Sequence, residues 1–440
     1  MFEVISELVY EPLYAAVLLF SVFFILLFIG VPIAIAIALS SAILGFFIMP
    51  DMAAFVGAQK MYAGIDSFTL LAIPFFILAG NIMNSGGIAL RLVNFAKLSA
   101  GRFAGGLAHT NIVANMLFGS ISGSSIAAAA AVGGVMAPLQ KKEGYSPEFS
   151  AAVNIASAPS GILIPPSGPL ILFSLVSGGT SISALFIGGY IPGIMMGLAC
   201  MIVAWYYAKK NNYPVAGKPT FQEAKRVTFE ALPSLLLVVV VIGGIVAGIF
   251  TATEGAGIAV IYSLALSIIY RMATIKDYIE TLRKSLIMSA SILLLIAASG
   301  IMSWVMAFTG IPDAISELIL KIDNPILVLL LINVCLLVVG TFMDLTPAVL
   351  IFTPIFMPIT SHLGMDPVHF GLMMIFNLGL GNMTPPVGSV LFIGCSVGNT
   401  TIEAVTKPLI PFFFALLVML LFITYVPFLT TGLPTLLNLM

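Results

Sequence analysis

Long apolar runs separated by short polar segments fill the whole chain, and this pattern predicts a bundle of membrane-spanning helices. The runs lack the two-residue alternation of an outer-membrane barrel, so every span is expected to be helical. The first two runs cover 13–30 and 31–49, and a third covers 67–85. A polar linker at 209–229 divides the chain into two halves that show a similar order of runs.

Two of the runs, 147–178 and 367–398, carry prolines and glycines that a continuous helix does not tolerate. We expect the first of these helices to break near Pro159 and to restart around Gly168. Backbone groups freed in this way survive in lipid only where they are buried in protein or line a polar cavity. Two broken helices at matching places in two halves therefore indicate the binding site of a transporter.

The two halves are related by a sequence repeat. At an offset of 220, eight Gly or Pro positions match between residues 119 and 178, where chance predicts roughly one. The matched pairs are Pro138/Pro358, Gly144/Gly364, Pro147/Pro367, Gly161/Gly381, Pro165/Pro385, Pro166/Pro386, Gly168/Gly388 and Gly178/Gly398. Each half also holds a weaker pair of runs, at 103–140 and 326–361, which we interpret as a re-entrant hairpin.

Amphipathic stretches precede both hairpins, at 88–103 and 312–321. Such helices tend to lie in the interface plane, where they would serve as arms that connect a mobile unit to a fixed scaffold. Ordinary loop helices would show the same pattern, so that alternative stays open.

Composition and charge indicate the class and the orientation. Of the 440 residues, 60% are hydrophobic and 8% charged, against about 25% charged in soluble proteins. The net charge of −1 gives no support to nucleic-acid binding. With the N-terminus outside and both hairpins re-entrant, fifteen of the seventeen Lys and Arg residues fall on the cytoplasmic side, and only Lys60 and Lys321 fall outside. Each half then crosses the membrane five times, so the halves are inverted.

The predicted fold is therefore an all-α polytopic membrane protein with two inverted repeats. The first repeat, 1–208, comprises a scaffold at 13–85, the arm at 88–103, the hairpin at 103–140, the broken helix at 147–178 and a helix at 184–208. After the cytoplasmic linker, the second repeat, 230–440, comprises a scaffold at 230–308, the arm at 312–321, the hairpin at 326–361, the broken helix at 367–398 and a helix at 408–430.

Both hairpin turns are rich in oxygen ligands. The first contains Gly119–Ser125 and the second Gly340–Pro347. Hydroxyls and free carbonyls at a helix break suit Na⁺, a hard cation that prefers oxygen. Asp344 is the only acid at a hairpin tip, and an ionisable group at membrane depth is a functional candidate by default. Small residues also let helices pack closely in lipid, and we assign the Ala127–Ala131 run to packing.

Other polar residues have structural interpretations. Glu254 follows Thr251 at the spacing of a capping box that opens a helix. His109, His362 and His369 lie near the expected membrane edges and are interpreted as surface or interfacial packing residues. No Arg or Lys lies in the broken-helix regions, so an anionic substrate would be held by backbone N–H groups at half-helix N-termini, by hydroxyls and amides, and by bound cations.

Four segments together resemble a known family: Ile29–Ser40, Gly119–Ser125, Ile164–Ser167 and Asn382–Gly388. They are similar to the large membrane subunit of tripartite ATP-independent periplasmic (TRAP) transporters, and the resemblance covers essentially the whole chain. It implies an elevator-type carrier of the ion-transporter superfamily, driven by a Na⁺ gradient in the bacterial inner membrane, with a periplasmic N-terminus.

The resemblance also implies partners. These are a small four-helix membrane subunit and a periplasmic substrate-binding protein that delivers an organic acid, such as a C4-dicarboxylate or sialic acid. Twelve residues precede the first span, so we expect the small subunit to be a separate chain.

In that superfamily the sodium sites are built from the hairpin tips and the facing helix breaks. Carried over to this sequence, the Na⁺ candidates are Ser120, Ser122, Ser124, Ser125, Ser157, Ser160, Gly161, Thr341, Asp344, Thr346, Gly381, Asn382 and Thr384. The substrate candidates at the broken helices are Asn154, Pro165, Ser167, Asn377, Pro385 and Gly388.

Enzymatic alternatives have little support. An intramembrane aspartyl protease needs two membrane aspartates, and only Asp344 qualifies; a zinc protease needs a His-Glu-x-x-His motif, which the sequence lacks. An ion channel is the nearer alternative, because two pseudo-symmetric re-entrant hairpins also suit a pore. A stand-alone cation-coupled carboxylate carrier is a further one.

Overall fold

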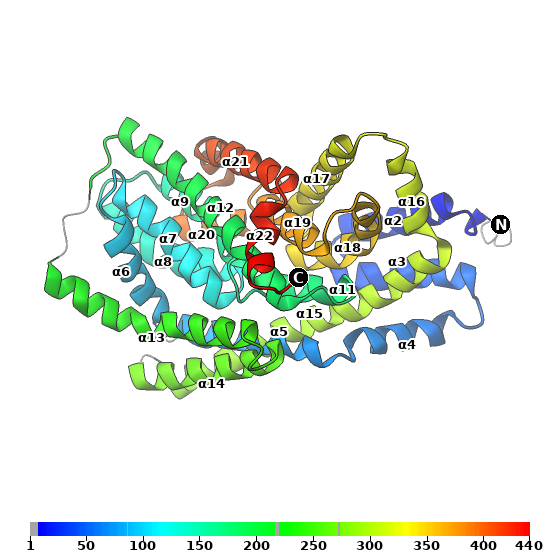
Figure 1. Cartoon of the computed structure of the whole chain (residues 1–440), viewed down its shortest axis with the longest axis horizontal. Coiled ribbons are helices and arrows are strands. Elements are labelled where there is room, and N and C mark those ends of the chain that lie inside the picture. Colours follow the sequence, from blue (N-terminus) through cyan, green and yellow to red (C-terminus); the bar gives the residue numbers. More distant parts are fainter. Residues whose placement is uncertain (1–7, 86, 216–219, 272) are drawn as a thin grey trace.

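The computed structural model describes residues 8–85, 87–215, 220–271 and 273–440, and within these ranges every regular element is a helix (Figure 1). The predicted all-α class is thus confirmed. Ahead of the linker the helices are α2 (Pro12–Phe28), α3 (Ile33–Ile48), α4 (Ala53–Ile65), η1 (Phe68–Leu71), α5 (Ala72–Ser85), α6 (Ile88–Ala100), α7 (Gly106–Ser122), α8 (Ser125–Lys142), α9 (Pro147–Ser157), α10 (Ser160–Leu163), α11 (Gly168–Val176) and α12 (Ile182–Lys210).

After the linker the order is repeated. The helices are α13 (Phe221–Val246), α14 (Ala252–Tyr270), α15 (Ile275–Thr309), α16 (Ile311–Leu320), α17 (Pro325–Phe342), α18 (Leu345–His362), α19 (Pro367–Gly381), α20 (Ser389–Gly398), α21 (Ile402–Tyr425) and α22 (Phe428–Leu436). Of the helices in the described ranges, seven are long and apolar enough to cross a membrane, or up to nine if each of two bent pairs forms one span.

The helices form two interlocked groups. The helices α3, α4, α5, α13, α14 and α15 pack on one another across the two halves, and Figure 1 shows α4, α5, α13 and α14 along one edge of the molecule. The second group contains the helix pairs α7–α8 and α17–α18 together with α9, α10, α11, α19 and α20, which pack among themselves. Figure 1 also places the start of α2 and the start of α13 at opposite ends of the molecule.

The structure corrects the predicted scaffold at α4, where no helix was expected between 49 and 67. This helix is bent by 60° against the following one, and the two together match the length of α15 in the second half. Its polar Gln59 and Lys60 and several small residues lower the apolar signal, which explains the omission.

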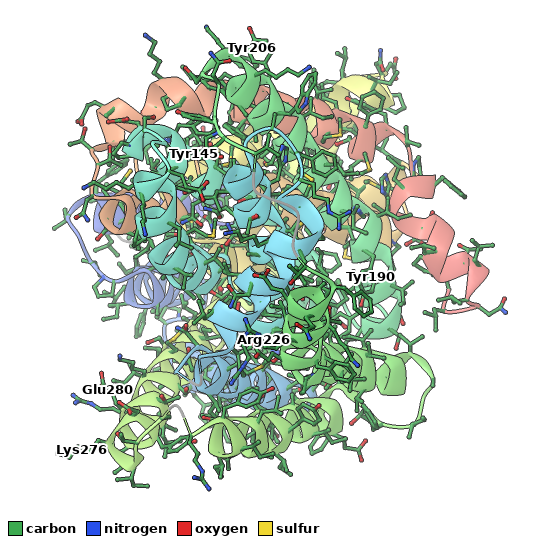
Figure 2. The ribbon with its side chains drawn as sticks, turned by 90° about the vertical axis from the view of Figure 1, so that its left-hand side faces the viewer. Tyr145, Tyr190, Tyr206, Arg226, Lys276 and Glu280 are labelled. Atoms are coloured by element: carbon green, nitrogen blue, oxygen red, sulfur yellow. The ribbon has the colours of Figure 1, made fainter. Side chains whose placement is uncertain are left out.

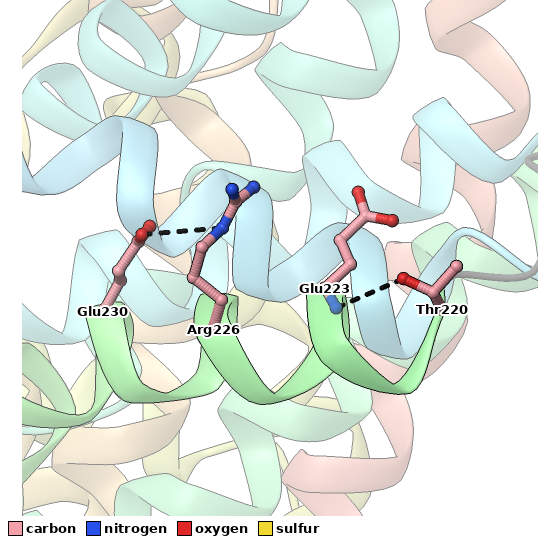
Figure 3. A network of polar contacts seen from close by, with 4 residues as sticks. All are labelled: Thr220, Glu223, Arg226 and Glu230. Atoms are coloured by element: carbon pink, nitrogen blue, oxygen red, sulfur yellow. Dashed lines mark hydrogen bonds and ion pairs between the residues drawn. The ribbon is translucent and has the colours of Figure 1, made fainter.

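The linker is shorter than predicted, because α12 continues to Lys210 and α13 already begins at Phe221. The Thr220 side chain caps α13 by accepting the N–H of Glu223 at 3.2 Å, and Arg226 pairs with Glu230 at 3.8 Å (Figure 3). These first turns are charged and exposed, so a search for apolar runs does not register them as part of a span.

The last predicted helix, 408–430, is also corrected. It begins earlier, at Ile402, and ends at Tyr425. A separate helix, α22, follows Pro427 and packs against α12 and α19. The capping box predicted at Thr251 is confirmed, since the Glu254 carboxylate accepts the backbone N–H of Thr251 at 2.7 Å.

The first break lies later than predicted. The backbone stays helical through Ala158 and Pro159, and the extended segment is 164–167, before α11 restarts at Gly168 as expected. Proline φ is compatible with a helical turn, so Pro159 removes one backbone donor without ending the helix. The Pro165–Pro166 and Pro385–Pro386 peptide bonds are both cis.

An aromatic cluster ties the end of α12 to the start of the first broken helix. The Tyr145 and Tyr213 rings stack with centroids 4.2 Å apart, and Phe149 lies 5.5 Å from Tyr213 and 5.2 Å from Tyr207. Figure 2 shows Tyr145 in the upper part of the molecule. Burial raises the pKa of Tyr145 to about 12.

Candidate functional site

A polar cavity lies where the two hairpin turns meet the scaffold. It has a volume of about 360 Å³. One wall is formed by α5 and α15, and the opposite wall by the α7–α8 turn, the α17–α18 turn and the start of α11. Its polar lining consists of Asn81, Ser122, Ser124, Ser125, Ser291, Asp344, Thr346 and Asn382. The cavity therefore joins both repeats at their helix breaks.

Local sequence shapes the first turn. Helix α7 ends at Gly123, whose left-handed backbone (φ +63°) favours glycine. Ser124 then caps α8 by accepting the N–H of Ala127 at 3.3 Å. The Ser122 hydroxyl donates to the Ser124 carbonyl at 3.4 Å. Three serines of this turn thus face the cavity, and their role as ion ligands stays a prediction.

Glycine pairs hold each hairpin against its broken helix. A Cβ on Gly161 would lie 2.3 Å from the Gly119 Cα, and a Cβ on Gly381 would lie 2.5 Å from the Gly340 Cα. No side chain fits at such a backbone contact. The predicted ion candidates Gly161 and Gly381 therefore set the approach of two backbones and do not line the cavity.

Buried asparagines tie the same elements together. The Asn115 amide donates to the Asn154 side chain at 3.0 Å and to the Ser157 hydroxyl at 2.8 Å. In the second half, the Asn377 amide donates to the Asn333 side chain at 2.8 Å. Asn154 and Asn377 are buried at these helix contacts, although Asn377 Oδ1 has no hydrogen-bond partner among the described residues. Neither residue lines the cavity, so their geometry gives no support to the predicted substrate role.

The second turn concentrates oxygen atoms around one carboxylate. Asp344 Oδ1 accepts from the Asn382 amide at 3.3 Å and from the Ser389 hydroxyl at 3.1 Å. Asn382 Oδ1 is buried and has no hydrogen-bond partner among the described residues. The carbonyls of Asn382 and Thr384 lie beside Gly388, within 2.9 Å of where its Cβ would be. Carboxylate and amide oxygens are ligands that a hard cation takes, and the cation role of this turn stays a prediction.

The remaining predicted residues lie behind the cavity wall. The hydroxyls of Ser120, Ser157, Ser160, Thr341 and Thr384 each donate to a carbonyl three or four residues earlier in the chain, and Ser167 donates to the Ile162 carbonyl. Pro165 is buried and Pro385 half-buried at the two breaks, and the Gly388 N–H donates to the Thr341 carbonyl at 3.3 Å.

Sequence reasoning missed three polar residues of the site. Asn81 and Ser291 contribute from the scaffold wall, and Ser389 contacts Asp344. An isolated polar residue inside an apolar span was the available signal for the first two.

The histidine interpretation needs a correction. His109 and His369 are buried, and His369 contacts the Thr430 hydroxyl at 2.7 Å; His362 is exposed. The packing of α22 over α19 covers His369, and this contact could not be read from the sequence.

Comparison with known proteins identifies the family. A model of the DctM component of tripartite ATP-independent periplasmic transporters matches residues 20–429. The chain belongs to this family. The TRAP resemblance seen in the sequence is thereby confirmed, and the chain is a multi-pass transporter permease subunit of this class.

Relatives of the TRAP chain match most of its length. YgiK of Salmonella typhimurium is 55% identical over 429 residues, which cover 97% of this chain and 99% of YgiK. The sialic acid TRAP transporter large permease protein SiaM of Vibrio cholerae is 38% identical over 396 residues, covering 89% and 92% of the two chains. Other relatives, 36–39% identical, are named for C4-dicarboxylate, isethionate and 2,3-diketo-L-gulonate transport.

A solved structure shares the fold. The YdaH transporter of Alcanivorax borkumensis is similar with a TM-score of 0.62 at 12% identity, over 89% of this chain and 95% of that chain. At this identity the likeness concerns the fold alone.

Proposed function

We propose that this TRAP large subunit imports a small organic acid together with Na⁺ by an elevator movement of its hairpins and broken helices against the scaffold. A periplasmic binding protein would deliver the substrate, and a small membrane subunit would complete the complex in the bacterial inner membrane. The N-terminus is placed on the periplasmic side.

The observation that carries the elevator proposal is a difference in register between the two scaffold walls. The cavity contacts α5 over 73–81 and α15 over 287–295. Adding the repeat offset of 220 to the first range gives 293–301, so the contact on α15 begins six positions before its counterpart. At 1.5 Å per residue this is about 9 Å along the helix.

A core midway between two inverted scaffold halves would contact corresponding residues of α5 and α15. The observed contacts indicate a core displaced toward the N-terminal end of α15. If the two halves exchanged their conformations, residues 67–75 of the first half and 293–301 of α15 would contact the cavity instead. Inverted repeats that alternate between two such arrangements give alternating access.

The charge pattern supports a direction for this displacement. With the N-terminus outside, the start of α15 lies on the cytoplasmic side, which carries fifteen of the seventeen Lys and Arg residues. We therefore assign the arrangement of the structure to an inward-facing state.

Sodium coupling rests on the oxygen cluster around Asp344. Its carboxylate is the one acidic group in the lining of the cavity within the described residues, and Asn382 Oδ1 offers a further free acceptor. A cation bound there would neutralise the carboxylate and leave the cavity able to accept an anionic substrate.

The size of the cavity favours a small substrate, since about 360 Å³ is near the lower end of ligand pockets. The relatives are named for sialic acid, C4-dicarboxylate, isethionate and diketogulonate, all of which are small organic acids.

Uptake into proteoliposomes tests this proposal. With the small subunit and binding protein present, we expect saturable, Na⁺-dependent uptake of the binding protein's ligand, and little uptake when either partner is omitted. Asp344→Asn should raise the Na⁺ midpoint at least tenfold, whereas Asp323→Asn, at an exposed turn, should not change it. An unchanged Na⁺ midpoint and rate in the Asp344 variant would remove this residue from the coupling site.

A further inference from the structure

A second, smaller cavity lies inside the hairpin group, away from the site described above. It is enclosed by α7, α8, α9 and α20 and has a volume of about 10 Å³. This is close to the room that a single water molecule requires. Its lining includes the polar residues Asn111, Gln140, Ser150 and Asn154.

Three buried polar atoms of this lining have no hydrogen-bond partner within the described residues. They are Asn111 Nδ2, Gln140 Oε1 and Ser150 Oγ. The relative exposure of these residues is 1%, 0% and 4%. Leaving one such atom unpaired costs about 1–3 kcal/mol, so three at one cavity point to an occupant that bonds to all of them.

Neighbouring hydrogen bonds fix which amide atom faces the cavity. Gln140 Nε2 donates to the Leu107 carbonyl at 3.2 Å, which leaves Oε1 toward the cavity. Asn154 Nδ2 donates to the Ala129 carbonyl at 2.8 Å, so its oxygen accepts from Asn115 Nδ2 at 3.0 Å. Asn111 Oδ1 lies 3.1 Å from Asn115 Nδ2 and shares the two hydrogens of that group with the Asn154 and Ser157 oxygens, which leaves Asn111 Nδ2 free. The cavity thus offers one donor, one acceptor and one hydroxyl.

We propose that this cavity is a binding site for one structural water. The water accepts from Asn111, donates to Gln140 and exchanges a hydrogen bond with Ser150, which gives the three bonds typical of a buried water. A cation does not fit, because Asn111 presents an N–H group and the lining supplies no carboxylate. The inference is independent of the proposed function.

The water extends the asparagine network of the first repeat. It links Ser150 on α9 and Gln140 on α8 to Asn111, which in turn accepts from Asn115. Asn115 contacts Asn154 and Ser157 on the broken helix. Three helices of the hairpin group are thereby joined by one continuous set of hydrogen bonds.

Two substitutions at one position distinguish a wet cavity from a dry one. Ser150→Ala removes one of the three bonds and should lower the melting midpoint of the purified protein by about 1–2 °C. Ser150→Val fills the cavity and displaces the water, so its midpoint should fall further. Ser299→Ala is the control, since this buried serine donates within its own helix to Leu295 and does not line this cavity, and its midpoint should fall less than that of Ser150→Ala.

A rise in the midpoint of Ser150→Val would show a dry, underpacked cavity and overturn the proposal. An experimental structure that resolves buried waters should show a peak within hydrogen-bond distance of Asn111, Gln140 and Ser150, in choline buffer as in Na⁺. Its absence, or its loss in choline, would equally overturn the assignment to water.

Discussion

At the scale of single residues, glycines decide how the hairpins meet the broken helices. The Gly161 and Gly381 positions emerge from the repeat, because both belong to the matched Gly and Pro pairs. Their contact partners, Gly119 and Gly340, could not be predicted, since a linear pattern does not reveal which backbones touch.

We predict that Gly161→Ala destabilises the protein by about 1–3 kcal/mol, because its Cβ would overlap the Gly119 backbone. Thermal unfolding should show a lower midpoint, and uptake should fall with it. Gly134→Ala is the matched control, since a Cβ there meets no atom within 4 Å and should leave both measurements unchanged. Equal midpoints for the two variants would contradict the close backbone contact.

The oxygen-rich character of both tips was readable from the sequence, and Ser122, Ser124, Ser125, Asp344, Thr346 and Asn382 do line the cavity. The roles of the substrate candidates Asn154 and Asn377 could not be predicted in the same way. An asparagine next to a helix break can serve a ligand or tie two helices, and only the contacts distinguish these uses.

At the scale of elements, apolar runs predicted the middle of each helix better than its ends. The helices α13 and α15 begin in charged, exposed turns that are capped by Thr220 and Thr274. Hydropathy registers burial in lipid and not hydrogen bonding, so helical turns that extend into water escaped it.

The inverted arrangement of the hairpins predicts opposite accessibility. A cysteine at Glu143, beyond α8, should react with a membrane-impermeant maleimide only from the cytoplasm, and one at Ser361, in the last turn of α18, only from outside. Both positions are exposed. A cysteine at the nearby Ser146 would remove the cap of α9, and one at Gly364 would strain a backbone with φ +71°, so these positions are avoided. Labelling of both cysteines from the same side would rule out inverted hairpins.

At the scale of the whole molecule, the contact between the first hairpin and the scaffold would distinguish the two arrangements of the proposed elevator movement. The tip of the first hairpin rests on Gly80 of α5, where an added Cβ would lie 3.0 Å from the Ser122 Cα. In the elevator movement that we propose, this contact belongs to the displaced arrangement and would be lost in the exchanged one.

Gly80→Leu should therefore disfavour the arrangement seen here and reduce uptake at least tenfold, while leaving the melting midpoint near that of the unmodified protein. Gly243→Leu, on the exposed face of scaffold helix α13, is the control and should transport normally. Normal uptake by the Gly80 variant would show that transport does not require this contact between the hairpin tip and α5.

The aromatic cluster and the short linker after it limit how far the first half can move relative to the scaffold helix α13. Tyr213 is stacked on Tyr145 beside the core, and seven residues later Thr220 caps the first scaffold helix of the second half. A chain of seven steps reaches at most about 25 Å. The backbone between Tyr213 and Thr220 thus limits the distance of any elevator movement in this chain. A larger movement would require Tyr213 to leave its stacking contact with Tyr145.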